Sequence, residues 1–80
     1  YVNLIIEVIG DKQMSVKELM SAVGLKNREN FMNNYLSPAI ESGYVRLQYP
    51  NSPRHPRQKY LLTVQGITLY NDMLIPLGKV

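Results

Sequence analysis

Residues 44–62 read YVRLQYPNSPRHPRQKYLL, a segment with strand-like ends and a proline-rich middle. Residues 44–48 alternate apolar and polar side chains and are rich in β-forming residues, which predicts a strand. Residues 59–62 are its expected antiparallel partner. The prolines at 50, 53 and 56 lack backbone donors and restrict φ, so we expect an extended, stiff loop that does not pair as an edge strand. The segment therefore predicts a β-hairpin.

Three helices are expected on the N-terminal side of this hairpin. Residues 2–9 carry apolar residues at helical spacing and are followed by Gly10, a common helix end. The sequence SVKE at residues 15–18 has the form of a capping box, which predicts a second helix that ends at Gly24. Residues 11–14 between these helices form a connector or a stub strand. The inward side of the second helix is expected to hold Val16, Leu19, Met20 and Val23.

Asn27 is a favourable N-cap for a third helix, which residues 42–43 end. Pro38 removes a backbone donor inside this helix, so we expect a kink or a restart at Ser37. The tight turn at residues 24–26 joins the second and third helices and predicts a helix-turn-helix. The apolar side of the third helix is expected to hold Phe31, Tyr35, Leu36 and Ile40.

A last helix is expected after the hairpin. Thr63 can cap it, and Gly66 in its first turn permits a close backbone approach. The order α, α, α, β, loop, β, α predicts an α+β fold, namely a winged helix-turn-helix with three helices, a two-stranded β-hairpin as the wing and a C-terminal helix. The apolar side of that last helix is expected to hold Ile67, Leu69, Tyr70, Met73 and Leu74.

The length and composition predict a single domain over residues 1–80, with 45% of the residues hydrophobic. The absence of cysteine excludes disulfides and thiolate metal sites and fits a reducing compartment. The sequence has no apolar run long enough to span a membrane and no secretion leader, so we expect a cytoplasmic setting. Because the chain starts at Tyr1 without a methionine, we expect a piece of a longer polypeptide with an accessory function.

Positive charge is concentrated in one part of the chain. The net charge is +3, from nine Lys and Arg against six Asp and Glu. A polyanion is the natural partner of a surface that gathers basic residues, and a solvated loop is the alternative. Residues 42–71 contain no acid and four bases, Arg46, Arg54, Arg57 and Lys59.

Several short motifs resemble those of winged-helix DNA-binding domains of bacterial regulators. They are the helix-turn-helix, the phrase ESGYV at residues 41–45 and the phrase LTVQG at residues 62–66. More narrowly, NYLSPAI at residues 34–40 with Gly43, followed by QKY at residues 58–60, resembles the C-terminal winged helix of bacterial Fic-family proteins and of Schlafen-AlbA-type ATP-binding regulators. This resemblance implies that catalytic chemistry resides in upstream domains, since the Fic nucleotidyl-transfer motif, a histidine with a glycine-rich anion loop, is absent here.

The resemblance also implies which residues face double-stranded DNA. It places the N-terminal part of the third helix in the DNA groove and the loop tip beside it. Asparagine can bond adenine edges, arginine can bond guanine edges, and basic loop residues can neutralise phosphates. The residues concerned are Lys26, Asn27, Arg28, Asn30, Asn33 and Asn34 at and in the helix, and Arg54, His55, Arg57 and Lys59 in and beside the loop.

The charge of the third helix weakens this DNA interpretation. Lys26 and Arg28 are balanced by Glu29 and Glu41, so the helix is neutral overall. DNA-reading helices usually carry several bases, and asparagines on a helix can instead serve only to solvate its outer face.

The residue types argue against an enzyme. His55 is the only histidine, with no cysteine in the chain and no carboxylate nearby in sequence, so neither a metal site nor a catalytic triad can be assembled. The sequence also lacks a glycine-rich phosphate loop, and we expect no cofactor. Tyr35, Tyr44 and Tyr60 are spaced as packing residues rather than as platforms for stacked bases.

Two function classes remain open. The first is an accessory module of a bacterial regulator or Fic-like protein that binds double-stranded DNA and takes part in transcription regulation. The second is an interaction domain that uses the same fold to form a homodimer or to dock on the upstream domains of its own polypeptide. The acid-free basic segment favours the first class, and the neutral third helix favours the second.

Overall fold

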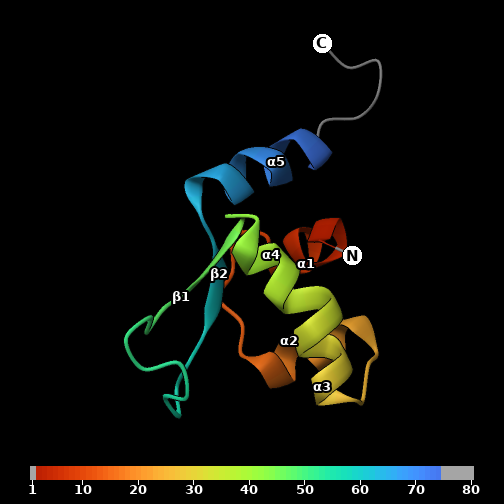
Figure 1. Ribbon diagram of the computed structural model, residues 1–80. Helices are drawn as coiled ribbons and strands as arrows, with labels where there is room; N and C mark the ends of the chain where they lie inside the picture. The colour runs from red at the N-terminus through yellow and green to blue at the C-terminus, as the bar shows by residue number, and fades with distance from the viewer. Residues whose placement is uncertain (1, 75–80) are drawn as a thin grey trace.

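The computed structural model describes residues 2–74, in which helical segments lie along one side of a two-stranded hairpin and α5 lies at one end of it (Figure 1). Helix α1 (Val2–Ile9) contacts both α2 (Val16–Val23) and the last helix, α5 (Val64–Leu74). A third helical segment lies between α2 and the hairpin and consists of α3 (Arg28–Phe31), the π-helical turn η1 (Met32–Leu36) and α4 (Ser37–Glu41). The order of elements confirms the predicted α+β class and gives a winged helix-like fold.

Side-chain caps begin α2 and α3, as predicted. Ser15 Oγ accepts a hydrogen bond from the Glu18 amide at 3.1 Å, and the Glu18 carboxylate accepts one from the Ser15 amide at 2.9 Å. This capping box satisfies two amides that lack partners within the helix. Asn27 Oδ1 accepts from the Asn30 amide at 2.8 Å and caps α3 in the same way. Gly24 ends α2 with a φ of 77°, a left-handed conformation that glycine adopts without strain.

The third helical segment changes its winding before Pro38. The π-helical turn η1 ends at Leu36, where the Ser37 amide donates to the Met32 carbonyl, and α4 starts at Ser37. A π turn is wider than an α turn. Here it ends just before Pro38, whose ring clashes with the preceding turn of a regular α-helix. The predicted restart at Ser37 is therefore confirmed.

Strands β1 (Val45–Leu47) and β2 (Tyr60–Leu62) form the antiparallel hairpin, with Arg46 opposite Leu61. On the other side of β2, the connector after α1 forms an isolated bridge. There the Met14 amide donates to the Tyr60 carbonyl at 3.0 Å, and the Tyr60 amide donates to the Met14 carbonyl at 2.7 Å. The connector thus contains the predicted stub strand, which ties the start of β2, next to the loop, to the start of α2.

The core lies where α1, α2 and the third helical segment meet the hairpin. Phe31 is completely buried there, and its ring stacks on that of Tyr35 with centroids 5.9 Å apart. Of the eight inward positions predicted for the second and third helices, four are buried and the other four pack against the core while partly buried. The buried residues come from the helices and from both strands. They are Ile5, Ile6, Ile9, Val16, Leu19, Phe31, Leu36, Ala39, Val45, Tyr60 and Leu62.

The predicted apolar side of α5 is partly wrong. Leu69 and Tyr70 pack against the core, but Ile67, Met73 and Leu74 are 43, 36 and 59% exposed. The rotation of α5 is set by Gly66, where an added Cβ would lie 2.1 Å from the Tyr44 carbonyl oxygen. Because Gly66 must face inward, the 100° step per residue turns Ile67 and Leu74 toward solvent.

The junction between the hairpin and α5 is closed by hydrogen bonds. The Thr63 amide donates to the Tyr44 carbonyl at 2.9 Å, and Thr63 Oγ1 donates to the Gly43 carbonyl at 2.6 Å. The same hydroxyl accepts from the Gly66 amide at 3.1 Å, which confirms Thr63 as the cap of α5.

Candidate nucleic-acid interface

Residues 48–59 connect the two strands, and we refer to them as the wing. Three consecutive turns build it, each closed by a hydrogen bond from an amide to the carbonyl three residues earlier. The bonded pairs are Ser52 to Tyr49, His55 to Ser52 and Gln58 to His55, at 3.1, 2.9 and 3.0 Å. The expectation of an extended loop is therefore wrong.

The positions of the prolines explain these turns. Pro50, Pro53 and Pro56 each occupy the second position of one turn, where the fixed φ of proline is favourable and no amide donor is needed. Their spacing of three residues matches the spacing of the turns. The expected stiffness thus has a different geometric basis, a chain of turns rather than an extended loop.

The side chain of Gln58 holds the wing together from inside. Its Oε1 accepts from the Tyr49 amide at 2.9 Å, and its Nε2 lies 3.0 Å from the Tyr49 carbonyl. The same amide nitrogen also lies within hydrogen-bond distance of the carbonyls of Ser52 and Pro53. Nothing in the spacing of residues pointed to Gln58, because its partners follow from the path of the folded loop.

His55 has a structural place in the wing. Its ring stacks on that of Tyr49 with centroids 3.9 Å apart and planes inclined by 7°. Its Nδ1 accepts a hydrogen bond from the Arg57 amide at 2.9 Å. The wing is thus ordered by its own side chains, which lowers the entropy lost when it binds a partner.

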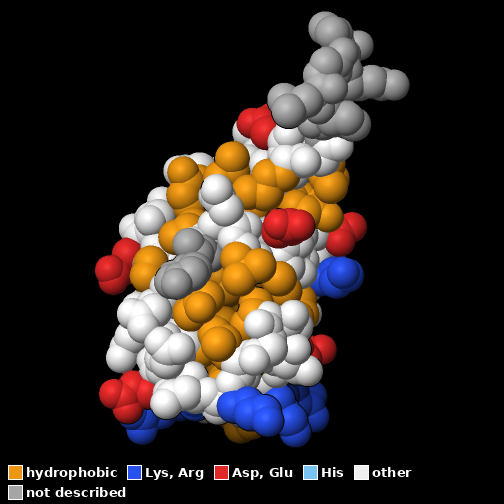
Figure 2. All heavy atoms as spheres, turned by 90° about the vertical axis from the view of Figure 1, so that its right-hand side faces the viewer, with side chains coloured by type: hydrophobic (Ala, Val, Ile, Leu, Met, Phe, Trp, Pro, Cys, Tyr) orange, Lys and Arg blue, Asp and Glu red, His pale blue; other side chains and the backbone are white. Residues whose placement is uncertain are grey.

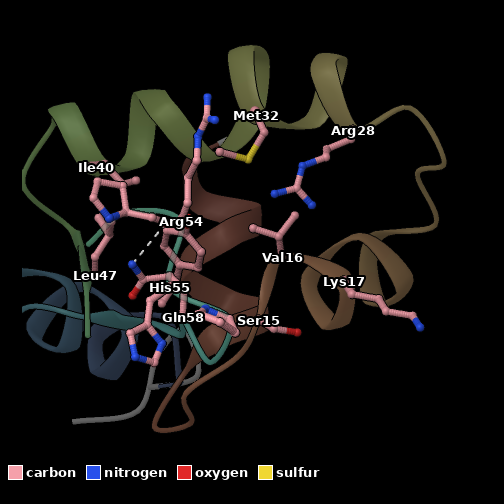
Figure 3. Close-up of a pocket in the computed structure, with 13 residues that line it drawn as sticks. Ser15, Val16, Lys17, Arg28, Met32, Ile40, Leu47, Arg54, His55 and Gln58 are labelled. Atoms are coloured by element: carbon pink, nitrogen blue, oxygen red, sulfur yellow. Dashed lines mark hydrogen bonds between the residues drawn. The ribbon is translucent and has the colours of Figure 1, made fainter. Parts of the chain in front are cut away.

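A groove of about 910 Å³ separates the wing from α2 and the third helical segment, and we call it the wing groove. Val16 and Met32 contribute apolar surface to it, as do Leu47 and the buried Tyr60. Figure 3 shows Arg28 reaching into this space from the start of α3 and Arg54 running from the wing toward the helical segment that carries Met32.

Arg28 influences the floor of this groove electrostatically. Burial raises the pKa of the Tyr60 hydroxyl, while the positive charge of Arg28 acts in the opposite direction. The helix and the wing therefore bring Arg28 and Arg54 to one groove, although 26 positions separate them in sequence.

The predicted asparagines lie together in a second, shallower hollow that also contains Glu29. Asn27 is engaged as the helix cap, and Asn30 Oδ1 accepts a hydrogen bond from Asn34 Nδ2. Asn33 is exposed beside them. The asparagines thus form a polar patch apart from Arg28, so the predicted helix residues divide between two faces.

Lys59 is engaged within the domain. Its Nζ lies 3.0 Å from Glu18 Oε1, and both side chains remain partly exposed. The backbone hydrogen bond from Ser15, followed by the bond from Lys59, lowers the pKa of Glu18 from 4.5 to about 2. A phosphate at Lys59 would have to compete with Glu18, and the role of Lys59 as a phosphate contact stays a prediction.

The other predicted residues and the overall charge distribution can be placed as well. Lys26 and Arg57 are exposed and line neither of the two hollows. Figure 2 shows apolar side chains over the upper and middle parts of one face, from the level of α5 to below that of α1. Lys and Arg side chains gather at the lower end of that face, at the level of α2, α3 and the wing. The main group of basic side chains therefore lies below the apolar surface on this face.

The described part of the chain offers neither a metal-binding cluster nor a membrane span. Within residues 2–74, no group of three or more His, Asp or Glu side chains is arranged to hold a metal ion. Over the same residues, every helix is too short or too polar to cross a bilayer.

Comparisons with known proteins identify the family. A family model described as the C-terminal domain of Filamentation induced by cAMP protein Fic-like proteins matches residues 1–63. The chain also resembles the crystal structure of a Fic family protein from Desulfovibrio desulfuricans, at 44% sequence identity and a TM-score of 0.75. That alignment covers 79% of this chain and 19% of the other, so the chain corresponds to a small part of that protein.

A comparison with curated proteins gave no match. The resemblance to Schlafen-AlbA-type regulators is not confirmed by these findings and stays a prediction. The resemblance to Fic-family proteins is confirmed, since the family model spans every element from α1 to the end of β2. This chain belongs to the family of Fic-like C-terminal domains.

Proposed function

We propose that this domain binds double-stranded DNA as an accessory module of a bacterial Fic-like protein and contributes to transcription regulation. The observation that carries the proposal is a preordered wing whose Arg54 lines one groove with Arg28 at the start of α3, while Arg57 adds an exposed positive charge on the same wing. Ordered basic loops next to a helix-turn-helix suit a phosphate backbone, because little entropy is lost when they bind.

In this proposal the two faces of the third helical segment contact different parts of the DNA. Arg28 and the wing arginines contact phosphates, which supply affinity but little sequence information. The exposed amides of Asn33 and Asn34 contact base edges, where asparagine favours adenine. Glu29 within the asparagine patch repels phosphates, which limits how deeply this face enters the groove.

Titration of a labelled duplex with the isolated domain tests the proposal. We expect a dissociation constant of about 10⁻⁴ to 10⁻⁶ M near physiological salt, the range of contacts that are mainly electrostatic, and tighter binding at low salt. Absence of binding at low salt, with the fold verified by circular dichroism, would rule the proposal out for the isolated domain.

A second experiment assigns the phosphate contacts to the wing. Replacing Arg54 and Arg57 together by alanine should weaken binding about equally for all sequences and reduce the salt slope by about 0.9 for each phosphate that the variant no longer neutralises. A control variant, with Lys12 and Arg46 replaced by alanine, removes the same charge from exposed positions that line neither hollow. Equal weakening in the two variants would contradict a specific role of the wing.

The second candidate function, an interaction domain, is favoured by the outer side of α5. Val64, Ile67 and Leu74 are 84, 43 and 59% exposed on one side of that helix, a stripe suited to a second copy or to other domains of a longer chain. Measuring the molar mass in solution, for wild type and for Ile67→Asp, tests this candidate. A monomer at all concentrations would leave only docking on other domains.

A further inference from the structure

The wing groove contains apolar side chains for which contact with DNA gives no role. Its surface includes the apolar side chains of Val16, Met32, Ile40 and Leu47. A phosphate backbone is charged and hydrated, so it gains little from covering apolar side chains. The groove therefore offers an apolar surface to some other ligand.

The charge of the groove indicates the kind of ligand. Arg28 and Arg54 reach into it from two elements, and Figure 3 shows Met32 and Val16 between them in that view. None of the residues that line the groove, all within the described range, is acidic. Arginine binds carboxylates with two parallel hydrogen bonds, so a ligand with carboxylates on both sides of an apolar group would complement this arrangement.

The size of the groove fits a short segment of chain. Its volume of about 910 Å³ lies near the upper end of the range usual for ligand pockets, about 300–1,000 Å³. The wing wall is ordered by Gln58 and by the stack of Tyr49 on His55, so the groove exists before a ligand arrives. A preformed site loses less entropy on binding.

We propose that the wing groove docks an acidic peptide segment that carries apolar side chains, and that this peptide competes with DNA for Arg28 and Arg54. The competition rests on the DNA binding proposed above, whereas the docking does not depend on it. Such a segment would regulate the domain by neutralising the charges through which it contacts phosphate.

Binding of two labelled peptides to the domain tests the docking without DNA. In the first peptide Leu alternates with Asp and Glu, and in the second Ser replaces every Leu. We expect the first peptide to bind at least about tenfold more tightly, the gain that burying one aliphatic side chain brings. Equal binding of both peptides would show charge attraction alone and overturn the proposal, as would absence of binding.

Two pairs of variants locate the peptide. Arg54→Glu should weaken binding of the first peptide at least about tenfold, while Arg46→Glu makes the same charge change on the exposed side of β1 and should have a much smaller effect. Met32→Gln should remove most of the advantage of the Leu peptide, while Met20→Gln alters an equally half-buried methionine outside the groove. If both variants of either pair weaken peptide binding equally, with the fold intact by circular dichroism, the peptide does not bind in the wing groove.

Adding unlabelled duplex to the peptide complex tests the competition. Displacement of the peptide supports competition, and binding of both ligands together overturns it while the docking stands. If DNA does not bind at all, the competition fails with the proposed function, and the peptide titration alone decides the docking. If Met32→Gln weakens DNA binding and the peptide does not bind, the groove is a nucleic-acid site and the proposal is overturned.

Discussion

Replacing Gln58 by alanine should loosen the wing and leave the rest of the domain folded. The side chain makes one hydrogen bond to the Tyr49 amide and shares its own amide among the carbonyls of Tyr49, Ser52 and Pro53. Because Nε2 carries two hydrogens, its three carbonyl contacts amount to two hydrogen bonds, which makes three with the bond from the Tyr49 amide. Water can replace these partners in a half-exposed loop, so each bond is assigned the low end of the usual range, about 0.5 kcal/mol. The sum, about 1.5 kcal/mol, corresponds to a roughly tenfold change in the opening equilibrium of the wing.

Hydrogen exchange of single amides measures this change. The amides of Ser52 and His55 close two of the wing turns, so both should exchange roughly tenfold faster in Gln58→Ala. The Tyr60 amide, bonded to Met14 at the start of β2, should keep its rate. Gln48→Ala is the matched control, because Gln48 is exposed at the edge of the wing. Unchanged exchange at Ser52 and His55 would show that the prolines alone hold the turns and would refute the reasoning.

Two further predictions concern the stability of the whole domain. Phe31→Ala empties a completely buried position and should lower the free energy of unfolding by about 3–5 kcal/mol, while Val64→Ala, at an 84% exposed site, should change it by no more than about 0.5 kcal/mol. A denaturation midpoint of Phe31→Ala close to wild type would contradict the core assignment. Because the folded pKa of Glu18 is about 2 and lies below its ordinary value of 4.5, its contribution to stability should be present above pH 4.5 and be lost as the pH falls to about 2. The midpoint difference between wild type and Glu18→Gln should therefore shrink over that interval, and a constant difference would refute the assignment.

Local signals in the sequence predicted much of the fold. The capping box at Ser15, the cap at Asn27 and the restart at Ser37 depend on residues within a few positions of one another, and all three are confirmed. Gly66 was predicted to allow a close backbone approach, and it lies against the Tyr44 carbonyl. Such features depend on short-range geometry, which a residue pattern specifies well.

Features that depend on contacts between distant residues were not predicted. Glu18 and Lys59 form their ion pair across 41 positions, and no pattern indicates that they meet. The outer side of α5 was misassigned, because helical spacing does not reveal which side the contact at Gly66 turns inward. The three-residue spacing of the prolines was a signal for consecutive turns, but proline alone suggested an extended loop.

The predicted site residues show the same limit. Arg28 and the four asparagines lie within eight consecutive residues, 27–34. The structure nevertheless places the asparagines in one hollow and Arg28 in the wing groove. A helix places neighbouring residues about 100° apart, so closeness in sequence does not place side chains on one face. Arg54 lines the same groove as Arg28 because the hairpin and the turns of the wing bring it there.

The junction around Thr63 has a mechanical consequence. Its hydrogen bonds to Gly43 and Tyr44, together with the tight approach of Gly66, leave no free hinge between the hairpin and α5. The hairpin and α5 are therefore held at a fixed angle to each other by the junction around Thr63. A partner held by α5 would be set at a fixed angle to whatever the wing touches, so the spacing between two bound partners would be dictated by the backbone of this small domain.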